Sequence, residues 1–285
     1  MRILDSEQLE LGEGPGYDPR RNTTWWFDIE RSQLFLHELS SASTRTHQLS
    51  VAGSAMAVTE DGRYVVVAAD GLHHFDPVTS TMRLLYSLEA DQPHLRSNDA
   101  RVHPSGHLWV STMGWKAEPK AGSIYLFHEG RFKKIASEIT IPNAICFSPD
   151  GKIGYFTDTR DGRIMKVALD PDAGCPVARP EVYIADLGGN PDGAVTDAEG
   201  NIWITLFGAG RIVVYDPSGQ KVGEMTAPTP NVTCPAFIGR DARHMLVTTA
   251  LFGMTETERA LDAQAGATFV TPINVAGRFD PPIKL

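Results

Sequence analysis

Three oxygen-bearing side chains occur in short Gly- or Pro-containing strings that lie far apart in the chain. They are Glu13 in Gly-Glu-Gly-Pro, Asn143 in Ile-Pro-Asn and Asp192 in Asn-Pro-Asp-Gly. Carboxylate and amide oxygens, without sulfur or imidazole, are the ligands that a hard divalent cation prefers. If the fold brings the three together, they predict a metal site. The alternative is three ordinary turns, because Pro-Asp-Gly and Pro-Asn are common turn sequences.

A fourth string, Arg96-Ser97-Asn98-Asp99, combines a cation, an amide and a carboxylate. If the fold brings this string to the same place, Arg96 and Asn98 would lie beside the three oxygen ligands, and a structural ion pair with Asp99 is the alternative for the arginine. The chain has no Gly-x-Ser-x-Gly, no His-Glu-x-x-His and no Cys-x-x-Cys, so neither a nucleophile elbow nor a common zinc spacing is expected. His73 and His74 are neighbours in a β-rich run and face opposite ways, which argues against a shared metal.

These strings lie at the same phase of a repeated unit. A β-rich run, a turn of Asp, Pro or Gly, and a second β-rich run recur six times. The turn positions are 40 to 49 residues apart and are Asn22, Gly62, Gly106, Gly151, Gly200 and Ala242. Third and fourth β-rich runs complete most units, which is typical of a β-propeller blade. The sequence therefore predicts an all-β, six-bladed β-propeller with a central metal-binding channel, as a single domain over residues 1–285. A β-sandwich and two small β domains are the alternatives.

Two segments fall outside the regular repeat. Residues 2–11 precede the first unit and could supply the outer strand of the last blade, which would close the ring. Residues 255–265 begin with a cap-like Thr255 and acidic residues and are followed by Gly266. This pattern predicts a short helix inserted in the sixth unit.

Composition limits the classes of partner. The net charge is −9, from 26 basic and 35 acidic residues, which argues against nucleic acid. No apolar run reaches the roughly 20 residues that span a bilayer, and the acidic N-terminus differs from a signal peptide, so no membrane partner is expected. Three cysteines, Cys146, Cys175 and Cys234, fit a reducing compartment. We expect a cytoplasmic protein, as a monomer or a homodimer.

Taken together and in order, these strings resemble the sugar-lactonase family that includes gluconolactonase, xylonolactonase and regucalcin. The resemblance runs over nearly the whole chain, through Leu11-Gly-Glu-Gly-Pro, Trp26-Phe-Asp-Ile, Arg96-Ser-Asn-Asp, Gly106-His-Leu-Trp-Val-Ser-Thr-Met, Ile141-Pro-Asn, Phe147-Ser-Pro-Asp-Gly, Tyr155-Phe-Thr-Asp-Thr, Pro191-Asp-Gly and Gly200-Asn-Ile-Trp. It implies a six-bladed propeller with one divalent cation in the channel, held by Glu13, Asn143 and Asp192. Ca²⁺ and Zn²⁺ are favoured over Mn²⁺, Mg²⁺ and Fe²⁺.

The implied activity is the metal-dependent hydrolysis of a small sugar lactone, an aldonolactone such as gluconolactone, to the aldonic acid. Asp192 would then serve as ligand and general base, and Arg96 and Asn98 would bind the substrate. One alternative is an esterase or phosphotriesterase that uses a similar metal. The other is a non-enzymatic, calcium-binding regulatory propeller, because fold alone does not fix function.

Three departures from the family pattern concern the substrate. Ala100 and Ala144 stand where the family usually has Gly, and each is expected to add a methyl near the pocket. The loop after Thr-Met, where the family often has an acidic residue, reads Gly-Trp-Lys-Ala-Glu-Pro-Lys over residues 114–120. Glu118 is the expected counterpart and a substrate-binding candidate. Trp115 of the same loop could stack on a sugar face or anchor the loop.

Overall fold

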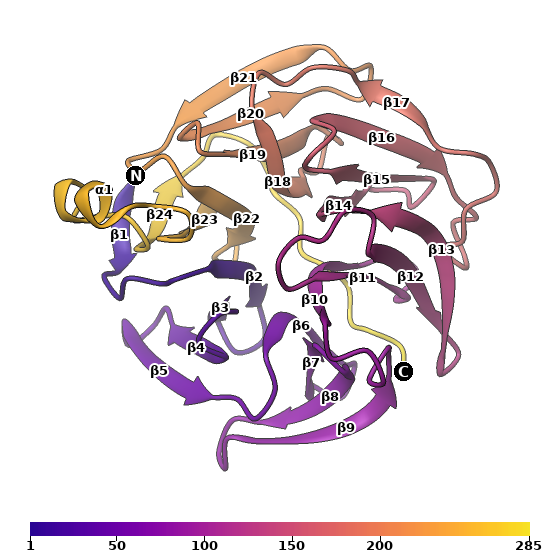
Figure 1. The fold of residues 1–285 in the computed structure, drawn as a ribbon, viewed down its shortest axis with the longest axis horizontal. Helices are drawn as coiled ribbons and strands as arrows, with labels where there is room; N and C mark the ends of the chain where they lie inside the picture. Colours follow the sequence, from indigo (N-terminus) through magenta and orange to yellow (C-terminus); the bar gives the residue numbers. More distant parts are fainter.

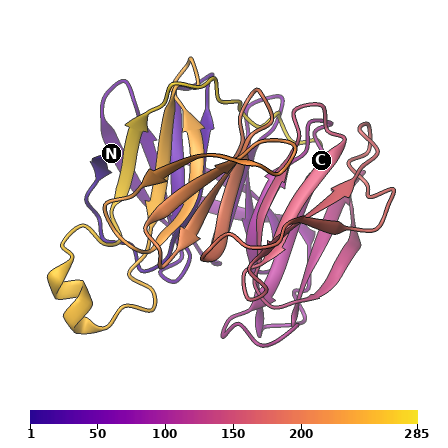
Figure 2. The same cartoon turned by 90° about the horizontal axis from the view of Figure 1, so that it is seen from above.

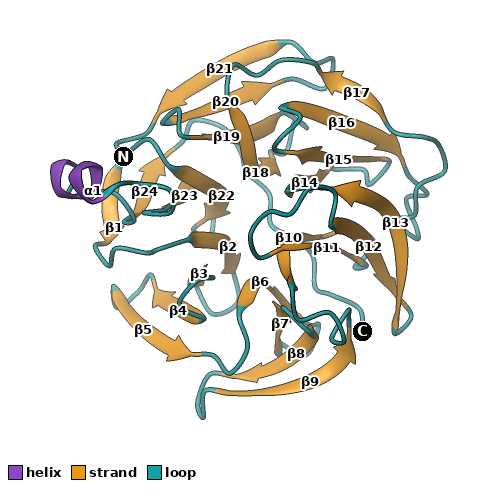
Figure 3. Ribbon diagram, in the orientation of Figure 1, coloured by secondary structure: helices purple, strands orange, loops and turns teal.

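Six four-stranded antiparallel sheets stand around a central axis in the computed structural model, which describes residues 1–285 (Figure 1, Figure 3). The first five blades follow one another along the chain, each from its innermost to its outermost strand. Their strands are β2 (Gly12–Asp18), β3 (Thr23–Asp28), β4 (Gln33–Glu38) and β5 (Ser43–Gln48); β6 (Gly53–Val58), β7 (Tyr64–Ala68), β8 (Gly71–Asp76) and β9 (Thr81–Ser87); β10 (Leu95–Val102), β11 (Leu108–Gly114), β12 (Gly122–His128) and β13 (Arg131–Ile139); β14 (Pro142–Phe147), β15 (Ile153–Asp158), β16 (Arg163–Ala168) and β17 (Glu181–Ile184); and β18 (Asn190–Thr196), β19 (Ile202–Phe207), β20 (Arg211–Tyr215) and β21 (Lys221–Thr226). The predicted six-bladed propeller is confirmed.

The sixth blade is made from both ends of the chain. Its order is β22 (Val232–Ile238), β23 (His244–Thr249), β24 (Thr268–Pro272) and β1 (Arg2–Asp5), and β1 pairs antiparallel with β24. In Figure 1 the indigo β1 lies beside the yellow β24. The expectation that residues 2–11 close the ring is therefore confirmed, and the first and last parts of the chain are held together by a β-ladder.

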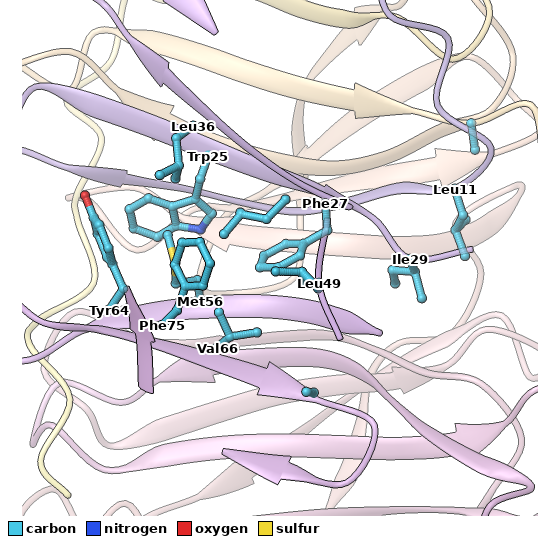
Figure 4. Packing of buried hydrophobic residues seen from close by; sticks show 13 residues of the cluster. Leu11, Trp25, Phe27, Ile29, Leu36, Leu49, Met56, Tyr64, Val66 and Phe75 are labelled. Carbon is cyan, nitrogen blue, oxygen red and sulfur yellow. The ribbon is translucent and has the colours of Figure 1, made fainter. Parts of the chain in front are cut away.

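Side chains of one strand pack against two different blades, because successive residues of a strand point to opposite faces. In β3, Trp25 and Phe27 pack with Val66 of the second blade (Figure 4). The residue between them, Trp26, packs with Leu246 of the sixth blade. Every residue of β3 is buried. In a strand that is buried on both faces, apolar residues follow one another without alternating with polar residues.

The turn after the innermost strand of each blade uses the left-handed backbone conformation. All six turn positions predicted from the repeat have φ between 53° and 90°. Glycine adopts this region without steric cost, and Asn tolerates it better than most residues. This requirement explains why glycine recurs at four of the six positions, and Ala242 adopts the same conformation with a Cβ.

The one helix, α1 (Glu256–Leu261), lies in the connection between β23 and β24. Thr255 is its N-cap and forms a capping box with Glu258, as the sequence indicated. The helix ends before the predicted residue 265 because none of its residues is buried, so no packed face extends it. Figure 2 shows it standing away from the blades, and it is far too short to cross a membrane.

The last ten residues, 276–285, cross one end of the central channel, and we call them the C-terminal strap (Figure 1). The backbone N–H of Gly277 donates to the Ala242 carbonyl (3.0 Å), that of Ile283 to Val58 (2.9 Å) and that of Lys284 to Gly106 (2.8 Å). These acceptors belong to the sixth, second and third blades. The strap therefore ties blades together at the end of the channel where the innermost strands finish.

Candidate functional site

Every innermost strand contains one extra residue relative to its neighbour, at the same level of the channel. The ladders shift register between Glu13 and Gly16, Gly53 and Ala55, Ser97 and Ala100, Asn143 and Cys146, Pro191 and Ala194, and Val232 and Pro235. Such β-bulges bend a strand and redirect its side chains, and they are common next to active sites. Each predicted metal ligand lies within a bulge or directly before one. The bulges form a ring around the channel, because the innermost strand of every blade contacts the innermost strands of both neighbouring blades.

Buried hydroxyl groups on the second strand of three blades donate hydrogen bonds to carbonyls of the innermost strand that the bulges leave without a backbone partner. Ser111 Oγ donates to the Asp99 carbonyl (2.8 Å), Thr205 Oγ1 to the Gly193 carbonyl (2.9 Å) and Thr248 Oγ1 to that of Cys234 (3.1 Å). An unpaired buried carbonyl would cost about 1–3 kcal/mol. The second strands therefore support the ring of bulges at the level of the site.

A chain of hydrogen bonds joins the third, fourth and fifth blades across the channel wall. Arg96 Nη1 donates to Asn98 Oδ1 (2.7 Å), and Asn98 Nδ2 donates to Asn143 Oδ1 (2.9 Å). Asn143 Nδ2 donates in turn to Thr159 Oγ1 (3.0 Å), whose hydroxyl donates to the Pro191 carbonyl (2.8 Å). The two asparagines and the arginine are thus fixed in orientation. The structure brings Arg96, Asn98 and Asn143 together as the sequence predicted.

Asp192 is buried and Glu13 half-buried in the same channel, and neither has a positive partner at ion-pair distance. Burial raises the pKa of Glu13 to about 8, although its hydrogen bond from the Gly14 N–H (3.0 Å) acts in the other direction. Burial, and then the charge of Glu13, raise the pKa of Asp192 well above its usual range. The Asp192 carboxylate accepts no hydrogen bond from the protein. Two acids of this kind need either protons or a cation to share the channel.

The donor set fits a hard divalent cation. Glu13 and Asp192 carry two formal negative charges, and no third His, Cys, Asp or Glu joins them. The third ligand would be the amide oxygen of Asn143, which accepts one hydrogen bond from Asn98 and keeps a second lone pair. An all-oxygen set with these charges suits Ca²⁺ and several other divalent ions.

Glycine follows both carboxylates because the next blade approaches closely there. Gly14 has φ of 53°, and a Cβ at this position would lie 1.9 Å from the Ser54 carbonyl oxygen. A Cβ at Gly193 would lie 2.3 Å from Cys234 Sγ. Since no side chain fits at either place, the Gly in Glu-Gly-Pro and in Pro-Asp-Gly is required by blade packing around the site.

The two alanines lie in different surroundings: Ala144 packs inside the channel wall, whereas Ala100 lines a chamber on the strap side of the channel. Ala144 is fully buried, and its methyl packs in a cluster with Cys146 and Ala194 between the fourth and fifth blades. Ala100 packs with Val110 on the side of the channel toward the C-terminal strap. Ala144 itself has φ of 53°, which accounts for a preference for Gly at this position.

Glu118 is turned back onto its own loop. Its Oε2 accepts a hydrogen bond from the Lys116 N–H (3.1 Å), and the carboxylate covers Gly114, where a Cβ would meet Oε2 at 1.9 Å. Glu118 forms no hydrogen bond with any other predicted site residue. Trp115, in the same loop, places its indole ring 5.6 Å from Cζ of Arg96.

Below the carboxylates, toward the strap, lies a chamber of about 350 Å³ that the sequence did not indicate. Arg101 crosses it and donates to a β18 carbonyl (3.1 Å) and to the strap residue Asp280 (3.1 Å). Asp99 accepts a hydrogen bond from the Ile145 N–H (2.6 Å), and burial raises its pKa to about 6. The alternative ion pair between Arg96 and Asp99 does not form. The strap-side end of the channel thus contains a chamber that an arginine crosses on its way to the strap.

Known proteins resemble this chain over its whole length. Residues 11–251 match the family described as the SMP-30/gluconolactonase/LRE-like region. A protein of Rhizobium meliloti, whose name assigns it to the sugar lactone lactonases, is 44% identical over 100% of this chain and 97% of its own length. The 6-deoxy-6-sulfogluconolactonase of Pseudomonas putida is 30% identical over 99% of this chain and 97% of its own. The solved structure of a calcium-binding protein, regucalcin, from Agrobacterium tumefaciens is 43% identical with a TM-score of 0.97, covering 100% of this chain and 97% of that one. The chain therefore belongs to the SMP-30/gluconolactonase/LRE-like family.

Proposed function

We propose that the chain, as a single domain, is a divalent-metal-dependent lactonase that hydrolyses a small sugar lactone, such as gluconolactone, to the aldonic acid. The observation that carries this proposal is the pair of channel carboxylates, half-buried Glu13 and buried Asp192, without an ion-paired protein cation to neutralise them. They lie next to a fixed arginine and two fixed asparagines. Relatives named as lactonases at 44% and 30% identity support the same reaction.

Glu13, Asn143 and Asp192 would hold the cation, with Ca²⁺ or Zn²⁺ favoured. A divalent ion supplies a Lewis acid for the lactone carbonyl and lowers the pKa of water near it. Two negative ligands and one neutral amide leave the loaded site without net charge, which suits a neutral sugar lactone. The name of the Agrobacterium neighbour, a calcium-binding protein, supports the same kind of ion.

Asp192 is the candidate general base, because its carboxylate is free of hydrogen bonds from the protein. The positive charge of a bound cation would keep the Asp192 carboxylate ionised, so that it could accept a proton from the attacking water. The water oxygen bonds to the carbonyl carbon, and the bond from that carbon to the ring oxygen breaks; the ring oxygen leaves with the bonding electrons and takes up the proton that Asp192 accepted from the water, which makes it a hydroxyl. Arg96 and Asn98 would hold the carbonyl or hydroxyl oxygens of the substrate during this exchange.

The test is a panel of substrates with metal-free protein. Chelator-treated protein is supplied separately with Ca²⁺, Zn²⁺, Mn²⁺ or Mg²⁺ and assayed on gluconolactone, other aldonolactones, an aryl ester and a phosphotriester. The proposal expects no turnover without metal and recovery on an aldonolactone. Turnover of the aryl ester or phosphotriester alone would assign a different hydrolase. Tight Ca²⁺ binding with no turnover of any substrate would favour a regulatory protein, and full activity after metal removal would refute metal dependence.

A further inference from the structure

Arg96 is a buried cation that keeps unused hydrogen-bond donors. Its side chain is only 5% exposed, and Nη1 donates to the Ser97 carbonyl (2.9 Å) and to Asn98 Oδ1 (2.7 Å). Nε is buried and has no partner, and Nη2 donates to no protein acceptor. Leaving such donors unpaired costs free energy, so the guanidinium is suited to bind an oxygen-rich ligand in the channel.

The indole of Trp115 is the aromatic surface against which this guanidinium rests. The distance of 5.6 Å from Arg96 Cζ to the ring centroid lies within the range of cation–π contacts. Trp115 is half-buried, so the ring contacts the arginine while another part of it faces solvent at the mouth. Because no carboxylate pairs with Arg96, the ring contributes to both its charge balance and its orientation.

The loop that carries Trp115 is held by its own hydrogen bonds. The N–H of Trp115 donates to the His94 carbonyl (3.1 Å), and that of Ala117 donates to the Gly114 carbonyl (2.9 Å). Glu118 Oε2 accepts from the Lys116 N–H (3.1 Å). These bonds close a tight loop between β11 and β12 and fix the backbone from which the Trp115 side chain projects.

We propose that Trp115 is a positioning residue for substrate binding: its ring holds the Arg96 guanidinium so that the free Nε and Nη2 donors are directed toward an oxygen of the lactone. This inference rests on the proposed lactonase function. An arginine that is already oriented loses less conformational freedom when the substrate binds. Removing the Trp115 ring should therefore mainly raise KM and change kcat less.

The kinetic test uses the lactone that the wild type hydrolyses fastest in the panel above. Trp115→Ala should raise KM about tenfold with kcat within about threefold, and Trp115→Phe, which keeps a ring, should recover most of the loss. The matched control is Lys116→Ala, an exposed side chain of the same loop, which should behave as wild type. Trp115→Ala kinetics equal to those of Lys116→Ala would overturn the proposal.

A double-mutant cycle separates action through Arg96 from direct stacking on the sugar. In an Arg96→Gln background, Trp115→Ala should have no further effect on kcat/KM, because the contact is already lost. A full tenfold effect in that background would mean that the ring contacts the sugar itself and would overturn the positioning role. Circular dichroism and thermal unfolding of each variant identify any that fail to fold, for which Arg96→Lys replaces Arg96→Gln.

A second readout does not depend on turnover. Acrylamide quenching of the Trp115 fluorescence, taken as the difference from Trp115→Phe, should increase when Arg96→Gln removes the cation that covers the ring. Unchanged quenching would overturn the contact whatever the activity. If the wild type hydrolyses no lactone, the proposed function fails and the positioning role fails with it. If the wild type is active and only the Trp115 effects are missing, the function stands and this inference alone is wrong.

Discussion

Replacing Glu13 with Gln should change how the stability of the metal-free protein depends on pH. Burial raises the pKa of Glu13 from its usual 4.5 to about 8 in the folded protein. The folded state therefore holds this proton more tightly than the unfolded state does. The contribution of the protonated Glu13 to stability is complete below pH 4.5 and is lost as pH rises through about 8.

The size of the effect follows from the two pKa values. At about 1.36 kcal/mol for each pH unit, the interval from 4.5 to about 8 corresponds to a ceiling of about 5 kcal/mol. Water entry and side-chain relaxation lower the cost of burying a charge, so we expect about 2–4 kcal/mol. The neutral amide of Gln does not titrate. The pH-dependent loss should therefore be much smaller in Glu13→Gln, with a remaining part that comes from Asp192.

The assay is urea unfolding in the presence of chelator between pH 5 and pH 8.5. The free energy of unfolding of the wild type should fall relative to that of Glu13→Gln as pH rises. Glu199→Gln, which changes an exposed carboxylate, is the matched control and should run parallel to the wild type. Parallel curves for the wild type and Glu13→Gln would refute the reasoning, because Glu13 would then not be buried in a charged form at all.

The same reasoning predicts how a divalent ion stabilises the fold. Because the pKa of Glu13 is about 8, the ion has fewer protons to displace from the site at pH 8 than at pH 5. The gain in melting temperature on adding Ca²⁺ should therefore be larger at pH 8 than at pH 5, and Glu13→Gln should reduce the gain at pH 8. An equal gain at both pH values would indicate that the ion binds elsewhere.

Four further outcomes are expected. Asp192→Asn keeps an oxygen ligand but removes the proposed base and one charge, so turnover should fall at least about 100-fold while calorimetry shows a smaller loss of metal affinity; equal losses would contradict the role as base. Asn98→Ala should raise KM about tenfold with most of the metal retained by elemental analysis, and wild-type kinetics would remove Asn98 from the substrate site. Gly14→Ala should destabilise by about 2 kcal/mol or more, because its Cβ would lie 1.9 Å from the Ser54 carbonyl oxygen; an unchanged urea midpoint would contradict this packing. Deleting residues 276–285 should lower the melting temperature by several degrees, since four blades lose backbone bonds to the strap, and an unchanged value would show that the strap does not hold the ring.

The repeat, the turns and the ring closure could be predicted from the sequence because each depends on local chemistry. All six turn positions, from Asn22 to Ala242, adopt the left-handed backbone, and such a requirement leaves a residue preference that repeats along the chain. The oxygen-bearing residues Glu13, Asn143 and Asp192 could be selected because they share one phase of that repeat. The capped start of α1 at Thr255 is local in the same sense.

Features that join different blades could not be predicted in this way. The six bulges share a position but no residue type, so no sequence pattern marks them, and the Ala144 methyl packs in a cluster between the fourth and fifth blades. The hydrogen bond from Arg101 to Asp280 joins the third blade to the C-terminal strap, and the residues around them in sequence give no sign of the partner. This contact exists only once the ring has closed, because the strap crosses the channel that the blades together form. The sequence by itself thus determined the blades and the kinds of group in the channel, whereas the tertiary structure alone decided which of them meet and which donors stay free.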